Sequence, residues 1–232
     1  MSDAPKKSSS LKMRVISGIV LCPLMIATLV AGGWYFLAVL GLAFVIAMTE
    51  LSKMLRAAPQ FFLLFLVAFI YICGAFASYI YLRFEFPAGA WLALIAMISV
   101  WASDSGAYFM GKSFGKHKMA PHISPNKTWE GFGGAVFFSG LFLVIMALLA
   151  PVLAPYLVTD LGKNPNIALF FVLGGILGGV GQVGDIVESY AKRKVGVKDA
   201  GAIIPGHGGL LDRIDSLLLV SPVFLGIVLL WM

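Results

Sequence analysis

The sequence predicts an all-α, polytopic integral membrane protein that crosses the bilayer about seven times. Of the 232 residues, 60% are hydrophobic and only 12% are charged. A water-soluble domain of this length needs far more polar residues to cover its surface. The apolar residues also form long runs, and the basic residues are confined to the segments between them. Together these observations exclude the ordinary soluble globular classes.

Seven apolar stretches approach the roughly 20 residues that a helix needs to cross a bilayer. They cover residues 15–30, 34–51, 61–82, 91–109, 132–153, 167–187 and 214–232. The first two are short and are separated only by glycines near Gly32, so they can form a tight helical hairpin. We expect residues 1–10 to be a disordered tail. Residues 11–90 then form an N-terminal set of membrane helices, and residues 91–232 form a second set with polar loops at 110–130 and 188–213.

The basic residues predict which ends of the spans face the cytoplasm. Fifteen of the 17 Lys and Arg precede the first span, follow the second, follow the fourth, or lie between the sixth and the seventh. Only Arg83 and Lys163 fall in the other connecting segments. Cytoplasmic loops of membrane proteins carry an excess of Lys and Arg. Seven spans with a cytoplasmic N-terminus, in the inner (cell) membrane, place all four basic segments on the cytoplasmic side.

One stretch, GAYFMGKS at residues 106–113, matches the G-x-x-x-x-G-K-[ST] pattern of phosphate-binding loops. Such a loop needs a strand before it and a helix after it, so that backbone N–H groups surround the phosphates. Here an apolar predicted helix precedes the match, and a segment rich in Gly, Pro and Lys follows it. We therefore interpret the match as accidental.

The sequence indicates neither a disulfide framework nor a zinc site. Cys22 and Cys73 both lie inside apolar runs and predict neither a disulfide framework nor a metal site. The three His are widely spread and have no cysteine partner, which does not suit a zinc site.

The carboxylates are more informative, because charged groups in or near hydrocarbon are costly and commonly face a partner, a cavity or an ion. Eight of the 11 acidic residues lie at predicted cytoplasmic span ends or loops: Glu50, Asp104, Glu130, Asp185, Glu188, Asp199, Asp212 and Asp215. Glu50 alone is interpreted as an interfacial charge that pairs with a nearby basic side chain.

Two span ends place carboxylates on one helical face, because residues at i, i+3, i+4 and i+7 share a face. The first stripe, in GDIVESYAKR at 184–193, consists of Asp185, Glu188, Ser189 and Lys192. The second, at the start of the last span, consists of Asp212, Asp215 and Ser216. Oxygen ligands of this kind suit Mg²⁺, which commonly keeps waters or substrate phosphates as its other ligands.

Basic residues of the same segments can neutralise phosphate oxygens: Lys112, Lys127, Lys192, Arg193, Lys198 and Arg213. Mg²⁺ between carboxylates and phosphates, flanked by Lys and Arg, is typical of phosphoryl and nucleotidyl transfer. Binding of lipid headgroups would explain the basic residues but not the carboxylate stripes. A cation or phosphate-ester transporter is another alternative, although the sequence shows no internal repeat and its charges lie at the span ends.

Residues 189–216, SYAKRKVGVKDAGAIIPGHGGLLDRIDS, resemble the signature of the phosphatidate cytidylyltransferase (CDP-diacylglycerol synthase) family. The matching positions are Ser189, Lys192, Arg193, Lys198, Asp199, Gly201, Pro205, His207, Gly208, Gly209, Asp212, Arg213 and Asp215. Residues 103–131, SDSGAYFMGKSFGKHKMAPHISPNKTWEG, are similar to a second region of that family. The first 90 residues resemble the family only in being membrane helices.

The resemblance implies Mg²⁺-dependent nucleotidyl transfer in phospholipid biosynthesis, in which CTP and phosphatidic acid give CDP-diacylglycerol and pyrophosphate. The implied cofactor is Mg²⁺, alone or with a second cation. The implied partners are the two substrates, the bilayer and a second copy of the chain. No nucleic-acid partner is expected. The segment 91–232 becomes the catalytic region. A different CTP-using membrane enzyme, such as a CDP-archaeol synthase or a lipid-alcohol kinase, is the nearest alternative.

The resemblance and the stripes together imply roles for individual residues. Metal and triphosphate chemistry falls to Asp185, Asp212 and Asp215, with Glu188 as a weaker metal ligand. Phosphates would be held by Lys192, Arg193 and Arg213. Ser189 and His207 would orient substrate and complete the catalytic set. The substrate-binding residues of the other wall and the loop would be Asp104, Lys112, Ser124, Lys127, Thr128, Lys198 and Asp199.

Overall fold

Seven helices and one β-hairpin make up the part of the chain that the computed structural model describes, residues 7–56, 58–153, 166–204 and 208–231. The helices are α1 (Lys7–Ala31), α2 (Gly33–Leu55), α3 (Phe61–Phe84), α4 (Gly89–Phe114), α5 (Trp129–Leu153), α7 (Ile167–Lys194) and α8 (Leu211–Trp231). Strands β1 (Lys118–Ala120) and β2 (Ser124–Thr128) pair antiparallel between α4 and α5. The predicted all-α class is confirmed, and the hairpin lies where a loop was expected. Of the expected tail, residues 7–10 belong to α1, and residues 1–6 lie outside the described part.

Six of the described helices are long and apolar enough to cross a membrane: α2, α3, α4, α5, α7 and α8. In α1 the apolar part, Ser17–Ala31, is shorter than these spans. The protein is therefore a multi-pass membrane protein, with six candidate spans and a shorter apolar helix where seven spans were predicted. Many large apolar side chains on the outer helix faces are exposed, as helices surrounded by lipid require.

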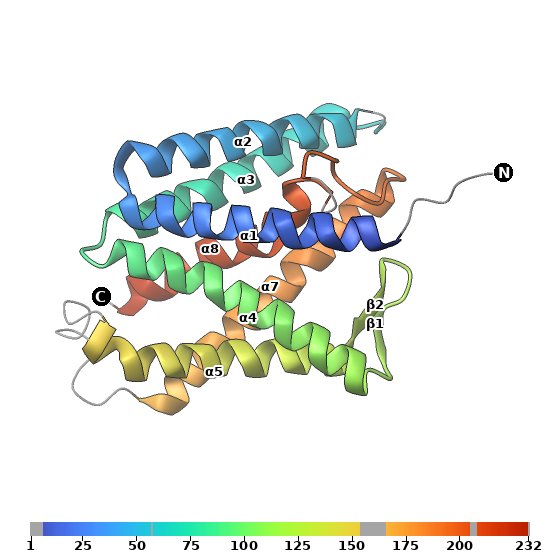
Figure 1. Ribbon diagram of the computed structural model, residues 1–232. Coiled ribbons are helices and arrows are strands. Elements are labelled where there is room, and N and C mark those ends of the chain that lie inside the picture. Colours follow the sequence, from blue (N-terminus) through green and yellow to red (C-terminus); the bar gives the residue numbers. More distant parts are fainter. Residues whose placement is uncertain (1–6, 57, 154–165, 205–207, 232) are drawn as a thin grey trace.

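Consecutive helices run in alternating directions (Figure 1). The last turns of α2, α4 and α7 and the first turns of α5 and α8 therefore gather at one end, the right-hand end of Figure 1. The hairpin and the described parts of the α7–α8 connection lie there too. We call this the polar end. The opposite end carries the α1–α2 and α3–α4 turns and the end of α8.

Close helix packing holds the half of the bundle formed by α4, α5 and α7. A Cβ added to Gly134 of α5 would lie 2.5 Å from the Gly106 carbonyl oxygen of α4. A Cβ added to Gly178 of α7 would lie 2.5 Å from the Ala135 carbonyl oxygen of α5. The glycines thus let the backbones touch, as small residues do at membrane helix interfaces.

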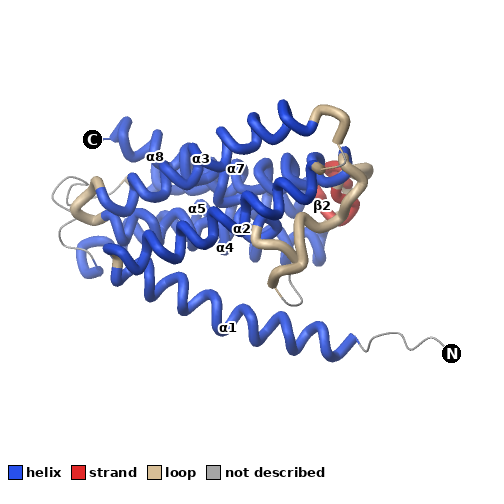
Figure 2. Tube along the Cα trace, turned by 90° about the horizontal axis from the view of Figure 1, so that it is seen from above, coloured by secondary structure: helices blue, strands red, loops and turns tan. Residues whose placement is uncertain are grey.

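Helix α1 lies at the outside of the bundle (Figure 2). Its C-terminal end is fixed from α3, where Arg83 Nε donates a hydrogen bond to the Leu29 carbonyl oxygen (2.7 Å). This contact satisfies a carbonyl that has no partner within its own helix.

The segment GAYFMGKS, residues 106–113, is continuous helix inside α4. Its backbone N–H groups serve the helix and cannot surround a phosphate, so the interpretation that it is not a P-loop is confirmed. Lys112 accordingly lies in the last turn of α4 and not in a loop.

Candidate active site

Four carboxylates from three helices converge at the polar end. Asp104 lies on α4, Asp185 and Glu188 on α7, and Asp215 on α8. Asp215 is within electrostatic range of the other three, and Asp104 is within range of Asp185. We call these four residues the acidic cluster. The sequence predicted all four as site residues, and the fold brings them together from positions more than a hundred residues apart.

The predicted stripe on α7 exists, because α7 remains helical as far as Lys194. Its members are also linked to one another. Ser189 Oγ donates a hydrogen bond to Asp185 Oδ1 (3.1 Å), and Lys192 Nζ donates one to Glu188 Oε2 (2.8 Å). The helical periodicity therefore correctly placed these side chains on one face.

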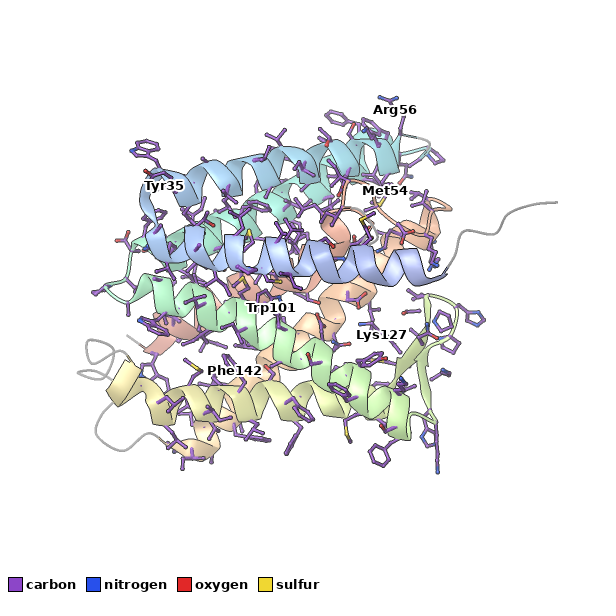
Figure 3. All side chains as sticks on the ribbon, in the orientation of Figure 1. Tyr35, Met54, Arg56, Trp101, Lys127 and Phe142 are labelled. Atoms are coloured by element: carbon purple, nitrogen blue, oxygen red, sulfur yellow. The ribbon has the colours of Figure 1, made fainter. Side chains whose placement is uncertain are left out.

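Strand β2 brings a lysine to this face of α7. Lys127 Nζ lies 2.8 Å from Asp185 Oδ2 and donates a hydrogen bond to Gln182 Oε1 (2.9 Å). Gln182 Nε2 donates in turn to Asp104 Oδ1 (3.1 Å). Figure 3 labels Lys127 beside the hairpin, at the polar end. One chain of polar contacts thus joins β2, α7 and α4.

Gln182 was missed by the sequence reasoning. It is buried and connects Lys127 with Asp104 across two helices. A signal was present, since Gln182 precedes Asp185 by three positions and so shares its helical face. A polar side chain inside an apolar span also points to a partner or a site.

Asp212 lies next to the acidic cluster, but protein donors occupy both of its oxygens. Lys192 Nζ donates to Oδ1 (2.6 Å), and the Gly209 N–H donates to Oδ2 (2.8 Å). The Ala200 N–H contacts both oxygens, at 3.1 and 3.0 Å. The Asp212 side chain is 6% exposed. This geometry supports Asp212 as the residue that organises the α7–α8 connection more than as a metal ligand.

Glu50 makes a contact that the sequence reasoning did not anticipate. Its side chain at the end of α2 is buried and accepts hydrogen bonds from the Leu210 N–H (3.1 Å) and the Leu211 N–H (3.0 Å). The carboxylate therefore caps the start of α8 from another helix. The prediction that Glu50 pairs with a basic side chain at the membrane surface is therefore wrong. Local spacing could not reveal the actual contact, because it joins segments that are far apart in the sequence.

Two further predicted site residues are engaged within the fold. Thr128 is buried, and its hydroxyl accepts a hydrogen bond from the Gly131 N–H (3.1 Å) at the start of α5. Arg193 donates from Nε to the Ile123 carbonyl oxygen (3.3 Å) and from a terminal nitrogen to the Val197 carbonyl oxygen (3.1 Å). Thr128 thus caps a helix, and Arg193 joins the hairpin to the α7–α8 connection.

The remaining predicted residues differ in their surroundings. Arg213 is exposed on the first turn of α8 and is within electrostatic range of Asp104. Ser124 is half-buried at the start of β2. Lys112 Nζ contacts the hydroxyl of Tyr108 on its own helix (3.3 Å). Lys198 and Asp199 are both exposed in the α7–α8 connection. His207 lies outside the described residues.

The donor set fits a hard divalent cation that is shared with substrate. Glu188 Oε1 is buried and has no hydrogen-bond partner, and Asp104, Asp185 and Glu188 all lie within electrostatic range of Asp215. Within the described ranges, no three His, Cys, Asp or Glu side chains form a metal site on their own. Mg²⁺ commonly binds through one or two carboxylates together with substrate phosphates. The arrangement therefore suits Mg²⁺ held between carboxylates and phosphates and not an all-protein cage.

Comparison with known proteins agrees with this chemistry. Residues 59–231 match the model of the cytidylyltransferase family. The chain is 44% identical over 156 residues to the phosphatidate cytidylyltransferase of Bacillus subtilis, which covers 67% of this chain and 54% of that protein. It is 39% identical over 199 residues to the phosphatidate cytidylyltransferase of Haemophilus influenzae (84% of this chain, 65% of that protein).

A relative of similar length comes from Rickettsia typhi, whose phosphatidate cytidylyltransferase is 33% identical over 222 residues. That alignment covers 96% of this chain and 93% of the relative, whereas the chain spans only 54% and 65% of the two longer relatives. The matched region contains the hairpin, the acidic cluster and both signature stretches. The chain therefore belongs to the cytidylyltransferase family.

Proposed function

We propose that the protein is a phosphatidate cytidylyltransferase, which makes CDP-diacylglycerol and pyrophosphate from CTP and phosphatidic acid. The observation that carries the proposal is the acidic cluster flanked by Lys127 and Lys192, at one end of a membrane helix bundle, in a chain of this family. Such an end can meet a water-soluble nucleotide and a lipid headgroup at the same time.

In the proposed reaction, a phosphate oxygen of phosphatidic acid attacks the α-phosphorus of CTP. The bond from that phosphorus to the oxygen bridging to the β-phosphate breaks, and pyrophosphate leaves with the bond electrons. The lipid phosphate is itself the nucleophile, so no covalent enzyme intermediate is needed.

Asp185 and Asp215 are the residues that we expect to hold Mg²⁺, with Glu188 as a third candidate. When bound, Mg²⁺ would neutralise charge on the triphosphate and on the leaving pyrophosphate. Lys127 and Arg213 would contact phosphate oxygens. Lys192 already bridges Glu188 and Asp212, so it would act mainly by fixing those two carboxylates.

The remaining parts of the proposal concern the orientation of the protein in the membrane, its assembly and a second cation. The polar end would face the cytoplasm, where CTP is dissolved, in the inner membrane. Assembly into a homodimer and a second cation beside Mg²⁺ belong to the same proposal on the strength of the family resemblance.

The decisive test is pyrophosphate release by the purified protein in detergent with phosphatidic acid, Mg²⁺ and CTP, dCTP, ATP or UTP in turn. We expect release that requires both the lipid and a cytidine nucleotide, with CDP-diacylglycerol as the lipid product. Asp185→Asn should lower the rate by at least about a hundredfold, as loss of a charged group acting on transferring phosphates commonly does. Folded protein that releases no pyrophosphate with any nucleotide would instead favour a transporter that uses the carboxylates as an ion path.

A further inference from the structure

A second feature of the molecule is an apolar cavity of about 350 Å³ lined by residues of α1, α2, α3, α4 and α8. Its walls include Leu21 and Met25 of α1, Phe76 of α3, Trp101 of α4 and Leu217 of α8. Figure 3 labels Trp101 between α1 and α4. The volume falls within the roughly 300–1,000 Å³ that is usual for small-molecule sites. The wall chemistry suits a hydrocarbon occupant.

One end of this cavity is charged. Among the described residues that line it, Arg213 is the sole charged side chain. Arg213 also lies within electrostatic range of Asp104 of the acidic cluster. The same side chain therefore borders both the apolar cavity and the proposed reaction site. An occupant with an apolar tail and an anionic head would match both ends.

We propose that this cavity holds one acyl chain of the lipid substrate while the lipid phosphate lies at Arg213. The inference rests on the proposed function. It adds the place where the lipid binds and the direction in which the bound lipid lies. Helix α1, which forms one wall, lies at the outside of the bundle (Figure 2), so the cavity is next to the surrounding bilayer. A chain bound there would bring its phosphate to the carboxylate side of α8.

The cavity would favour the reaction by orienting the lipid substrate, and not by transferring its acyl chain out of water. An acyl chain in a bilayer is already in apolar surroundings, so moving it between helices gains little from the hydrophobic effect. Fixing the chain, however, holds the phosphate in one position relative to the acidic cluster, which lowers the entropic cost of reaction. Filling the cavity should therefore impair use of the lipid and leave nucleotide binding intact.

Two glycines offer a matched pair of variants. A Cβ added to Gly18 of α1 or to Gly41 of α2 meets nothing within 4 Å. Gly18 lines the cavity, whereas Gly41 is exposed and does not. We expect Gly18→Phe to raise KM for dioleoyl phosphatidic acid about tenfold, as steric exclusion from a packed site does. KM for CTP should stay unchanged, and Gly41→Phe should behave as the unmodified protein. Equal effects of the two variants, or a rise in KM for CTP alone, would overturn the inference.

A binding test that needs no turnover separates this inference from the proposed function. Cys22 lines the cavity and is a free thiol, so its reaction with N-ethylmaleimide can be followed in a Cys73→Ala background. Micelles would contain dioleoyl phosphatidic acid, dioleoyl phosphatidylcholine or added glycerol 3-phosphate. We expect phosphatidic acid well above its Kd to slow labelling on the order of fivefold relative to phosphatidylcholine, and glycerol 3-phosphate to have no effect.

Equal protection by both lipids would show that the cavity does not select an anionic lipid. Protection by glycerol 3-phosphate alone would show that the phosphate, without an acyl chain, closes the site. Either result overturns the inference, whether or not the protein forms CDP-diacylglycerol. Absence of product with selective protection of Cys22 would instead overturn the proposed function and retain the lipid site.

Discussion

Asp185 and Asp212 have the same apparent role in the sequence, since each opens a carboxylate stripe at a span end. The structure gives them different surroundings. Asp212 accepts hydrogen bonds from Lys192 and from the backbone of Gly209 and Ala200. Asp185 pairs with Lys127, is one-third exposed, and lies near other carboxylates. Protein donors therefore hold both oxygens of Asp212, whereas in the proposed function Asp185 would face the bound phosphates.

Substitution by Asn should separate these two roles. Asp212→Asn leaves Lys192 and backbone donors without a full partner in a buried site, which costs about 3 kcal/mol and lowers Tm by roughly 6–12 °C in a protein of this size. Asp185→Asn should change Tm little, because the lost pair with Lys127 is offset by relief from neighbouring carboxylates. Both variants should lose activity. Thermal unfolding in detergent measures the difference, and equal Tm values for the two variants would contradict the assignment.

At the scale of elements, the first turn of α8 is held from three directions. Glu50 of α2 caps its N–H groups, Asp212 ties it to α7, and the backbone of Gly209 fits between them. A Cβ on Gly209 would lie 2.7 Å from both Glu50 Oε2 and the backbone nitrogen of Gly201. The glycine is therefore needed because two other segments approach the backbone at this position.

A double-mutant cycle tests this arrangement. Glu50→Ala should cost about 1–2 kcal/mol through loss of the cap, and Gly209→Ala about 1–3 kcal/mol through overpacking. Because Glu50→Ala removes one of the two close contacts, the double variant should be more stable than the sum predicts by about 1 kcal/mol. Gly226→Ala, also on α8, is the control, since its added Cβ meets nothing within 4 Å. Strict additivity in denaturant unfolding would argue against a direct contact.

These elements also show what could be predicted from the sequence. The helices and the stripe on α7 follow from apolar length and from helical periodicity, which are local properties. The pairing of Lys127 with Asp185 joins segments 58 positions apart, and that of Glu50 with α8 joins segments 160 apart. Such contacts depend on the way the helices pack, which periodicity does not determine. The hairpin was missed because its strands are short and lack an alternating apolar pattern.

At the scale of the whole molecule, the alternating helix directions bring the elements of the candidate site together toward one end of the bundle. The hairpin and the capped start of α8 lie there (Figure 1), and Lys127 of the hairpin pairs with Asp185 of the acidic cluster. Arg213, near the start of α8, also lines the apolar cavity. The basic segments at 53–56, 112–127 and 192–198, together with Arg213, lie at the same end, whereas Arg83 lies at the opposite end. This distribution is what the positive-inside rule requires of a bundle whose polar end faces the cytoplasm.

Single cysteines at the two ends test that orientation. In a Cys22→Ala, Cys73→Ala background, Lys198→Cys marks the polar end and Glu85→Cys marks the opposite end, and both native side chains are exposed. Because Lys and Arg are retained on the cytoplasmic side, a membrane-impermeant maleimide should label Glu85→Cys in right-side-out vesicles and Lys198→Cys in inside-out vesicles. Permeabilised vesicles, in which both sites should react, provide the control. The reverse pattern would place the acidic cluster on the side without CTP and would contradict the proposed reaction, while labelling of both sites from one side would contradict the alternation of the helices.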